Sequence, residues 1–257
     1  MLHTSRNLLK TQYYVSRYLA SGLKQRFLES NSPLDLRRKA LENTARHSRE
    51  ILGALNVQIH TKFCRENLFE RSYFMVCNHM SYLDILILST VRPAVFVTSV
   101  EMEKTFFLGD LAKLGGSFFV DRINRRKMKN EVAALKQLMA EGFDVFLFPE
   151  GTSTNGQEIL PFKKSLFRVP KETHSPILPI CLKYKSIDGE PFTLKNCDKI
   201  CWYGDMAFAP HFLQIMKTKE IVVELEYLNP LESSDFNTHG ELAEAVEAAI
   251  RQAYQDL

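Results

Sequence analysis

The sequence has 257 residues, of which 45% are hydrophobic and 25% are charged, so it is long enough for one large domain with a substantial apolar core. Its formal net charge is +3, which is too small to indicate a nucleic-acid-binding protein. Of its five cysteines only Cys197 and Cys201 lie close together, which is not a pattern of zinc ligands, and we expect reduced thiols.

The first 28 residues have the composition of a basic amphipathic helix. They contain no acidic residue, and apolar side chains alternate with arginines and lysines between residues 6 and 26. Such a helix can lie in the headgroup region of an anionic bilayer or cover an apolar face of the protein, and the sequence leaves both open. After a break at 31–33, the charged stretch 34–55 predicts a second helix. The chain has no run near the ~18 apolar residues of a spanning helix, so we expect it to be neither exported nor integral to a membrane.

From residue 56 onward the pattern changes to short β-rich runs separated by helical stretches, which is typical of an α/β sheet covered by helices. The runs predict strands at Val57–Phe63, Tyr73–Cys77, Val95–Thr98, Ser117–Val120, Val145–Phe148, Ile177–Tyr184 and Ile221–Tyr227. Helical periodicity predicts helices over Leu83–Leu88, Lys104–Leu114, Arg125–Glu141 and Gly240–Tyr254. The stretch 185–196 is predicted to be a polar connection. The chain is therefore divided into a helical pair, 1–55, and one domain, 56–257.

A first group of residues able to do chemistry, Asn78 to Asp84, begins where the predicted strand Tyr73–Cys77 ends, and strand ends are where α/β sheets bind their ligands. A neutral imidazole such as His79 can accept a hydroxyl proton when a carboxylate such as Asp84 bonds to the other ring nitrogen and fixes the tautomer. The pair suffices when the nucleophile is the substrate's own hydroxyl. A histidine satisfied within the core is the competing interpretation.

A second group, Phe148 to Thr154, also follows an apolar strand. The carboxylate of Glu150, the glycine at 151 and the hydroxyl of Thr152 suit a loop that holds a polyol and brings backbone N–H groups close to an anion. A tight turn would explain Pro149 and Gly151 but not the acid and the hydroxyls.

Two further blocks complete the pattern. Arg122 ends the block 116–122 at a predicted strand end and is a candidate phosphate ligand, because a guanidinium binds phosphate through two hydrogen bonds. The block 175–180 is an apolar strand bracketed by prolines, which alone indicates only an edge or constrained strand.

In order and spacing, the four blocks resemble the glycerolipid acyltransferase family typified by 1-acylglycerol-3-phosphate acyltransferases. The resemblance implies an α/β fold with a mixed sheet of about seven strands flanked by helices, and an amphipathic helical pair that associates with the membrane. It implies that His79 is the general base and Asp84 its partner. It also implies that Arg122, Glu150 and Gly151 bind the glycerophosphate of the acceptor, and Thr152 belongs to the same loop.

The resemblance further implies the reaction: a fatty acyl group moves directly from acyl-CoA or acyl carrier protein to the free hydroxyl of a lysophospholipid, without metal or cofactor. The resemblance places the helical pair at a membrane, and together with the expected reduced thiols and the basic first helix it predicts the cytoplasmic face and an anionic surface. The small net charge predicts no nucleic-acid partner. The alternative from another class is a non-catalytic lipid-binding protein at the membrane surface, but it leaves the pair His79 and Asp84 unexplained.

One departure from the family concerns the acceptor. Many lysophosphatidate acyltransferases have an arginine where this chain has Ser153. Lys163 or Lys164 could supply the missing cation, or the acceptor could carry another head group. The stretch 202–206 together with His211 is also similar to acyltransferases of lyso-ornithine lipids, which makes such a lipid the alternative acceptor.

Overall fold

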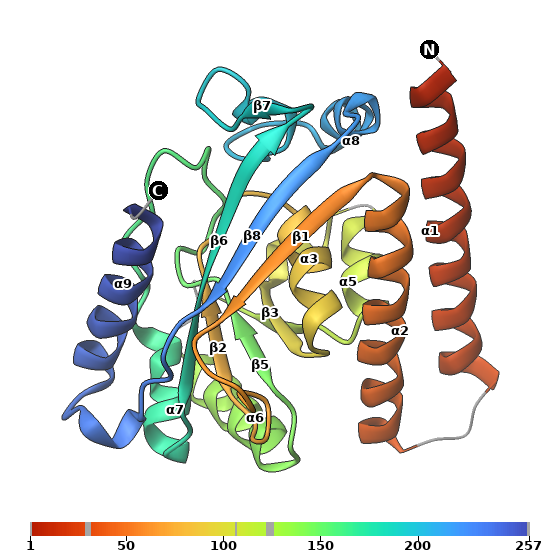
Figure 1. The fold of residues 1–257 in the computed structure, drawn as a ribbon. Coiled ribbons are helices and arrows are strands. Elements are labelled where there is room, and N and C mark those ends of the chain that lie inside the picture. Colours follow the sequence, from red (N-terminus) through yellow and green to blue (C-terminus); the bar gives the residue numbers. More distant parts are fainter. Residues whose placement is uncertain (1, 29–31, 106, 122–125, 256–257) are drawn as a thin grey trace.

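The computed structural model describes residues 2–28, 32–105, 107–121 and 126–255. Helix α1 (Leu2–Leu28) and helix α2 (Pro33–Ala54) lie side by side and antiparallel at one side of the molecule (Figure 1). Helix α2 begins where expected, because the Ser32 hydroxyl accepts from the N–H of Asp35 and Pro33 occupies the first turn. The predicted helical pair is confirmed.

The sheet is mixed and contains eight strands within the described residues: β1 (Val57–Phe63), β2 (Phe74–Cys77), β3 (Val95–Ser99), β4 (Phe118–Val120), β5 (Val145–Leu147), β6 (Ile177–Ile187), β7 (Glu190–Pro191) and β8 (Ile221–Tyr227). Their order is β1-β8-β6-β2-β5-β3-β4, with β7 paired to β6. The pair β6–β8 is antiparallel, as is β6–β7, and the other neighbours are parallel. The predicted fold class is confirmed, with all seven predicted strands present.

The prediction for 185–196 was incomplete. There the chain makes a tight hairpin between β6 and β7, in which Asp188 and Gly189 both have positive φ. An Asp-Gly pair is a favoured turn of this kind, so the sequence held a signal for the hairpin.

The remaining helices are α3 (Leu83–Val91), α4 (Val100–Glu103), α5 (Leu108–Leu114), α6 (Met128–Ala140), α7 (Arg168–Thr173), α8 (Phe208–Lys217) and α9 (His239–Gln255). Helices α7 and α8 were not predicted, since each is short and contains a proline. Each helix that the structure describes is too short or too polar to cross a membrane.

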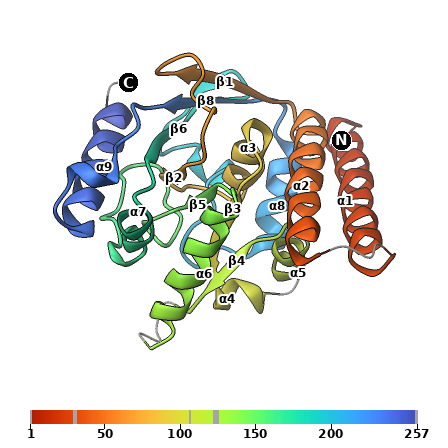
Figure 2. The same cartoon turned by 90° about the horizontal axis from the view of Figure 1, so that it is seen from below.

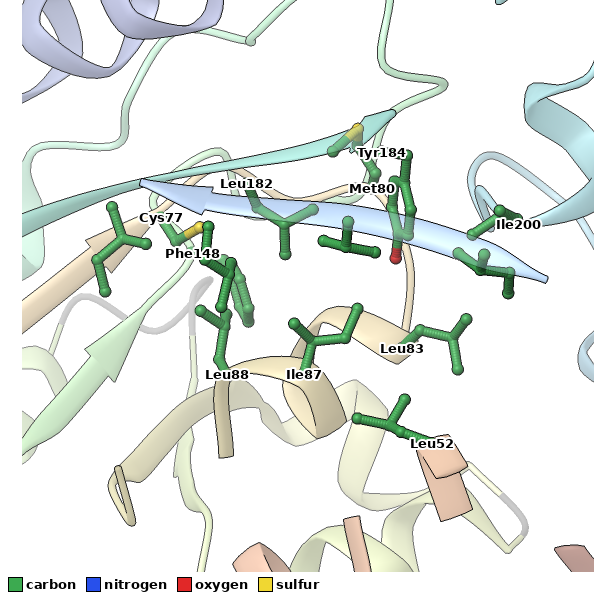
Figure 3. Packing of buried hydrophobic residues seen from close by; sticks show 14 of the residues in the cluster. Leu52, Cys77, Met80, Leu83, Ile87, Leu88, Phe148, Leu182, Tyr184 and Ile200 are labelled. Atoms are coloured by element: carbon green, nitrogen blue, oxygen red, sulfur yellow. The ribbon is translucent and has the colours of Figure 1, made fainter. Parts of the chain in front are cut away.

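The side chains of the central strands alternate between two apolar layers. Phe74 and Val76 of β2 face the layer that contains α6, α7 and α9, whereas Met75 and Cys77 face the layer that contains α2, α3 and α8. Figure 2 shows these two groups of helices on opposite sides of the curved sheet. Figure 3 shows α3 directing its apolar side chains toward the sheet, where they pack near Leu182 and Phe148. The second layer thereby surrounds the residues that follow β2.

Candidate active site

Three neighbouring strands bring together the two groups Asn78 to Asp84 and Phe148 to Thr154. Strand β2 lies between β5 and β6 and runs parallel to both, so the carboxyl ends of β2 and β5 reach the same edge of the sheet. His79 follows β2, and Glu150 follows β5. The backbone N–H of His79 donates to Glu150 Oε1 at 2.8 Å.

The side chain of His79 is paired with Asp84. Its Nδ1 lies 2.9 Å from Asp84 Oδ2. Because the carboxylate can only accept, this contact assigns the proton of the neutral imidazole to Nδ1 and leaves Nε2 able to accept a proton. The ring stacks on Phe148 with 4.0 Å between the ring centroids, and 18% of the His79 side chain is exposed. The geometry is that of an oriented general base.

Asp84 is fully buried, and its carboxylate accepts four hydrogen bonds. Besides the imidazole, Oδ2 accepts from the backbone N–H of Met80 at 2.7 Å and of Ser81 at 2.8 Å. Oδ1 accepts from the hydroxyl of Tyr184 on β6 at 2.7 Å. Burial raises the pKa of Tyr184, so the phenol stays protonated and remains a donor. These donors hold the carboxylate in the position from which it orients the imidazole of His79.

Glu150 is buried as well, and each oxygen of its carboxylate accepts a hydrogen bond from a backbone N–H group. Oε1 accepts from His79, and Oε2 accepts from the N–H of Leu160 at 2.7 Å. Burial raises the pKa of Glu150 to about 7, although both N–H groups favour the charged form. The carboxylate therefore ties the turn after β5 to the loop that carries His79.

Gly151 and Lys163 lie against each other at the turn after β5. Gly151 has a φ of +75°, a backbone conformation that favours glycine, and a Cβ there would lie 2.5 Å from Lys163 Nζ, so the lysine side chain packs directly over the turn. Thr152 is exposed beside them. Lys164, in contrast, forms an ion pair with Glu244 on α9. The two predicted lysines thus have different surroundings.

The remaining predictions concern Arg122 and the cysteines. Arg122 lies outside the described residues, whereas Ser117 of the block 116–122 lines the cavity that also contains His79. Cys77 is buried beside the site, and burial raises the pKa of its thiol, as suits a residue that packs in the core. None of the five cysteines forms a disulfide.

Sequence reasoning missed Tyr184, and it singled out the stretch 202–206 without predicting that the segment after the 3₁₀ turn Cys197–Lys199 contacts the loop after β2. Ser81 Oγ donates to Ile200 O at 2.7 Å, and Met80 O accepts from the N–H of Trp202 at 2.9 Å. Ser153 Oγ donates to Trp202 O. A lone hydroxyl at the end of the apolar strand Ile177–Tyr184 was a signal for Tyr184, but its partner depends on the strand register.

A cavity of about 670 Å³ connects His79 with the N-terminal helices. Apolar side chains from α1, α2, α3, α5 and α8 form most of its wall, and the loop 151–153 lies at the same end as His79. No group of three or more His, Cys, Asp or Glu side chains within the described part of the chain is placed to hold a metal ion.

Comparison with known proteins extends these observations. The family model described as Acyltransferase matches residues 56–183. A lyso-ornithine lipid O-acyltransferase of Rhizobium meliloti (strain 1021) is 30% identical over 216 residues, which cover 80% of this chain and 72% of that protein. The chain belongs to the acyltransferase family.

Other acyltransferases support this membership. A 1-acyl-sn-glycerol-3-phosphate acyltransferase of Neisseria gonorrhoeae is 24% identical over 182 residues, which cover 71% of this chain and 69% of that protein. The crystal structure of the 1-acyl-sn-glycerophosphate (LPA) acyltransferase from Thermotoga maritima has the same fold, with a TM-score of 0.67 and 19% identity over 99% of this chain and 97% of that one. The family match spans β1 to most of β6 and so includes His79, Asp84 and Glu150.

We expect Glu150→Gln to flatten the pH dependence of stability. The folded-state pKa of Glu150, about 7, lies above the ordinary 4.5, so the folded protein binds more protons than the unfolded chain between these values. The free energy of unfolding of the wild type should therefore fall as pH rises, by on the order of 2 kcal/mol between about pH 5 and pH 8 from this group. Urea unfolding at both pH values measures the difference. If the free energy of unfolding had the same pH dependence in wild type and variant, the raised pKa of Glu150 would be contradicted.

Proposed function

We propose that the protein transfers a fatty acyl group from acyl-CoA or acyl carrier protein to the free hydroxyl of a lysophospholipid, with 1-acylglycerol-3-phosphate as the acceptor. The observation that carries the proposal is the bonded pair of His79 and Asp84 on the wall of an apolar cavity. The reaction requires a proton acceptor beside a space for a fatty chain, and this arrangement supplies both.

In the proposed mechanism, the acceptor oxygen attacks the thioester carbonyl carbon while His79 Nε2 takes the hydroxyl proton. The tetrahedral intermediate then collapses, the carbon–sulfur bond breaks, and the thiol leaves with the proton that His79 returns. Asp84 keeps Nδ1–H in place and stabilises the imidazolium between the two steps. No acyl-enzyme forms, because the nucleophile is the substrate's own hydroxyl.

The acceptor head group is proposed to bind beside Gly151, Thr152 and Lys163. A phosphate there would receive a charge-assisted hydrogen bond from Lys163 Nζ. Arg122 remains the predicted second cation. Glu150 is proposed to position His79, because its carboxylate accepts a hydrogen bond from the backbone N–H of that residue.

Lyso-ornithine lipid is the second candidate acceptor, and Ser153 favours it. Its hydroxyl contacts Trp202 O where many lysophosphatidate acyltransferases have an arginine, so this position supplies an internal contact in place of a cation. The relative named for lyso-ornithine lipid is also more similar, at 30% identity, than the relative from Neisseria gonorrhoeae named for lysophosphatidate, at 24%.

Transfer of a labelled acyl group from acyl-CoA or acyl carrier protein to a panel of lysolipids tests the proposal. We expect lysophosphatidate to be acylated by the wild type. Acylation of lyso-ornithine lipid alone would leave the acyltransferase assignment intact and overturn the acceptor. Binding of lipid without transfer to any acceptor would favour the non-catalytic alternative.

The lysine pair gives a matched test of acceptor binding. We expect Lys163→Ala to lower kcat/KM for lysophosphatidate by roughly tenfold to a hundredfold, the scale of one charge-assisted hydrogen bond. Lys164→Ala removes the same charge from the next residue, where it pairs with exposed Glu244, and should change kcat/KM by less than about threefold. Equal effects of the two variants in steady-state assays would contradict the placement of the head group.

We also propose that α1 attaches the protein peripherally to an anionic membrane on its cytoplasmic face. Large apolar side chains form an exposed stripe along this helix, because their spacing places them on one face: Leu9, Tyr13, Leu23 and Phe27, exposed by 67%, 59%, 46% and 74%. The same spacing places Arg6, Lys10 and Lys24 along one border of the stripe. Apolar insertion and attraction to anionic lipid then act together.

We expect the double variant Leu9→Ser, Phe27→Ser to bind anionic vesicles at least roughly tenfold more weakly than the wild type, because it loses apolar surface that the bilayer would bury. Co-sedimentation with vesicles measures the binding. Leu194→Ser is the control, because Leu194 is 52% exposed but lies outside α1. This variant should bind vesicles as the wild type does. Unchanged sedimentation of the double variant would show that the stripe is not the attachment surface.

A further inference from the structure

The wall that α1 and α2 contribute to the cavity contains polar side chains among apolar ones. Thr11 on α1 and His47 and Ser48 on α2 line the cavity together with residues such as Val15 and Ile51. All three are at least 98% buried, with exposures of 1%, 2% and 1%. Side chains of this kind are expensive to bury unless something bonds to them.

Their polar atoms lack partners within the protein. Thr11 Oγ1, His47 Nε2 and Ser48 Oγ are buried without a hydrogen bond to any residue that the structure describes. Two other polar residues of the same wall are satisfied: Tyr18 OH donates to Leu111 O at 3.1 Å, and Thr44 Oγ1 donates to Ala40 O at 3.0 Å. The three open positions thus all line the cavity, and a buried side-chain polar atom normally has a hydrogen-bond partner.

The chemistry of the three atoms defines what they can bind. His47 Nδ1 lies 2.6 Å from Glu50 Oε2 and donates to that carboxylate, so Nε2 is an acceptor. Burial lowers the pKa of His47, which favours the neutral ring. The hydroxyls of Thr11 and Ser48 can donate or accept. One acceptor with two hydroxyls fits an uncharged group that both donates and accepts.

We propose that this wall is a hydroxyl-recognition site, and that the acyl chain held in the cavity carries a hydroxyl group that donates to His47 Nε2 and accepts from Thr11 or Ser48. A keto group could not donate to His47, and an ionic group would find no opposite charge among the three atoms. The inference rests on the proposed function, because the same cavity contains His79. It makes hydroxylated acyl chains the preferred substrate class.

The chain could belong to the donor or to the lysolipid, and two assay arms distinguish these sources. The first arm compares acyl-CoA substrates of one chain length that are unsubstituted, hydroxylated at successive carbons or oxidised to the ketone, with an unsubstituted lysolipid as acceptor. The second arm keeps an unsubstituted donor and varies the resident chain of the lysolipid in the same way. In one arm we expect kcat/KM for a hydroxylated chain to exceed that for the unsubstituted chain by about tenfold. The kcat/KM of the ketone should exceed that of the unsubstituted chain by a smaller factor.

The double variant Thr11→Val, Ser48→Ala tests the residues themselves. It should lose the preference, because turnover of the hydroxylated chain falls while that of the unsubstituted chain rises against the more apolar wall. Ser21→Ala is the matched control. It removes a hydroxyl from α1 that donates to Asn43 Oδ1 and does not line the cavity, so the preference should persist. Thermal unfolding verifies that each variant is folded.

A preference for unsubstituted chains in both arms would overturn the inference. So would a preference for hydroxylated chains that persists in the double variant. If no acyl transfer occurs with any substrate, the proposed function fails, and binding then tests the site alone. In that case a hydroxylated fatty acid should raise the thermal midpoint of the wild type more than the unsubstituted acid does, and the double variant should lose this difference. Equal shifts with both acids would overturn the site.

Discussion

The buried carboxylate of Asp84 depends on its four hydrogen-bond donors, because a charge without contact with water is stable only when fixed dipoles replace the solvent. Three of the donors come from His79, Met80 and Ser81 in the loop after β2, and the fourth is Tyr184 on β6. Asn78 fastens the two elements, since its amide donates to Leu182 O and accepts from the N–H of Leu182, each at 2.9 Å. The parallel pairing of β2 with β6 therefore sets the orientation of the histidine.

Helix α1 has two apolar faces with different surroundings. One face lines the cavity through residues such as Val15 and Leu19, and the other carries the exposed stripe. The two roles left open by the sequence are thus compatible, since the helix covers an apolar space of the protein while its outer face stays available to a bilayer. A fatty chain of a membrane lipid would have a short path from the bilayer to the cavity in this arrangement.

Features that depend on local sequence were predictable, and features that depend on long-range pairing were not. Short apolar runs such as Val145–Phe148 predicted the strands, and parallel strand ends explain why His79 and Glu150 meet. The hydroxyl of Tyr184 reaches Asp84 across 100 positions of sequence, which requires the register of β6 against β2. Thr11, His47 and Ser48 are ordinary polar positions of amphipathic helices until packing closes the cavity over them.

Turnover of His79→Ala and Asp84→Asn in the acyl-transfer assay tests whether His79 is the general base. We expect His79→Ala to unfold at the wild-type midpoint but to lose at least ~10²-fold in kcat, the usual scale of a positioned general base. Asp84→Asn should lose most of the same factor, because the amide no longer fixes the tautomer of the imidazole. Acyl transfer by folded His79→Ala at close to the wild-type rate would contradict the assignment of the histidine as the base.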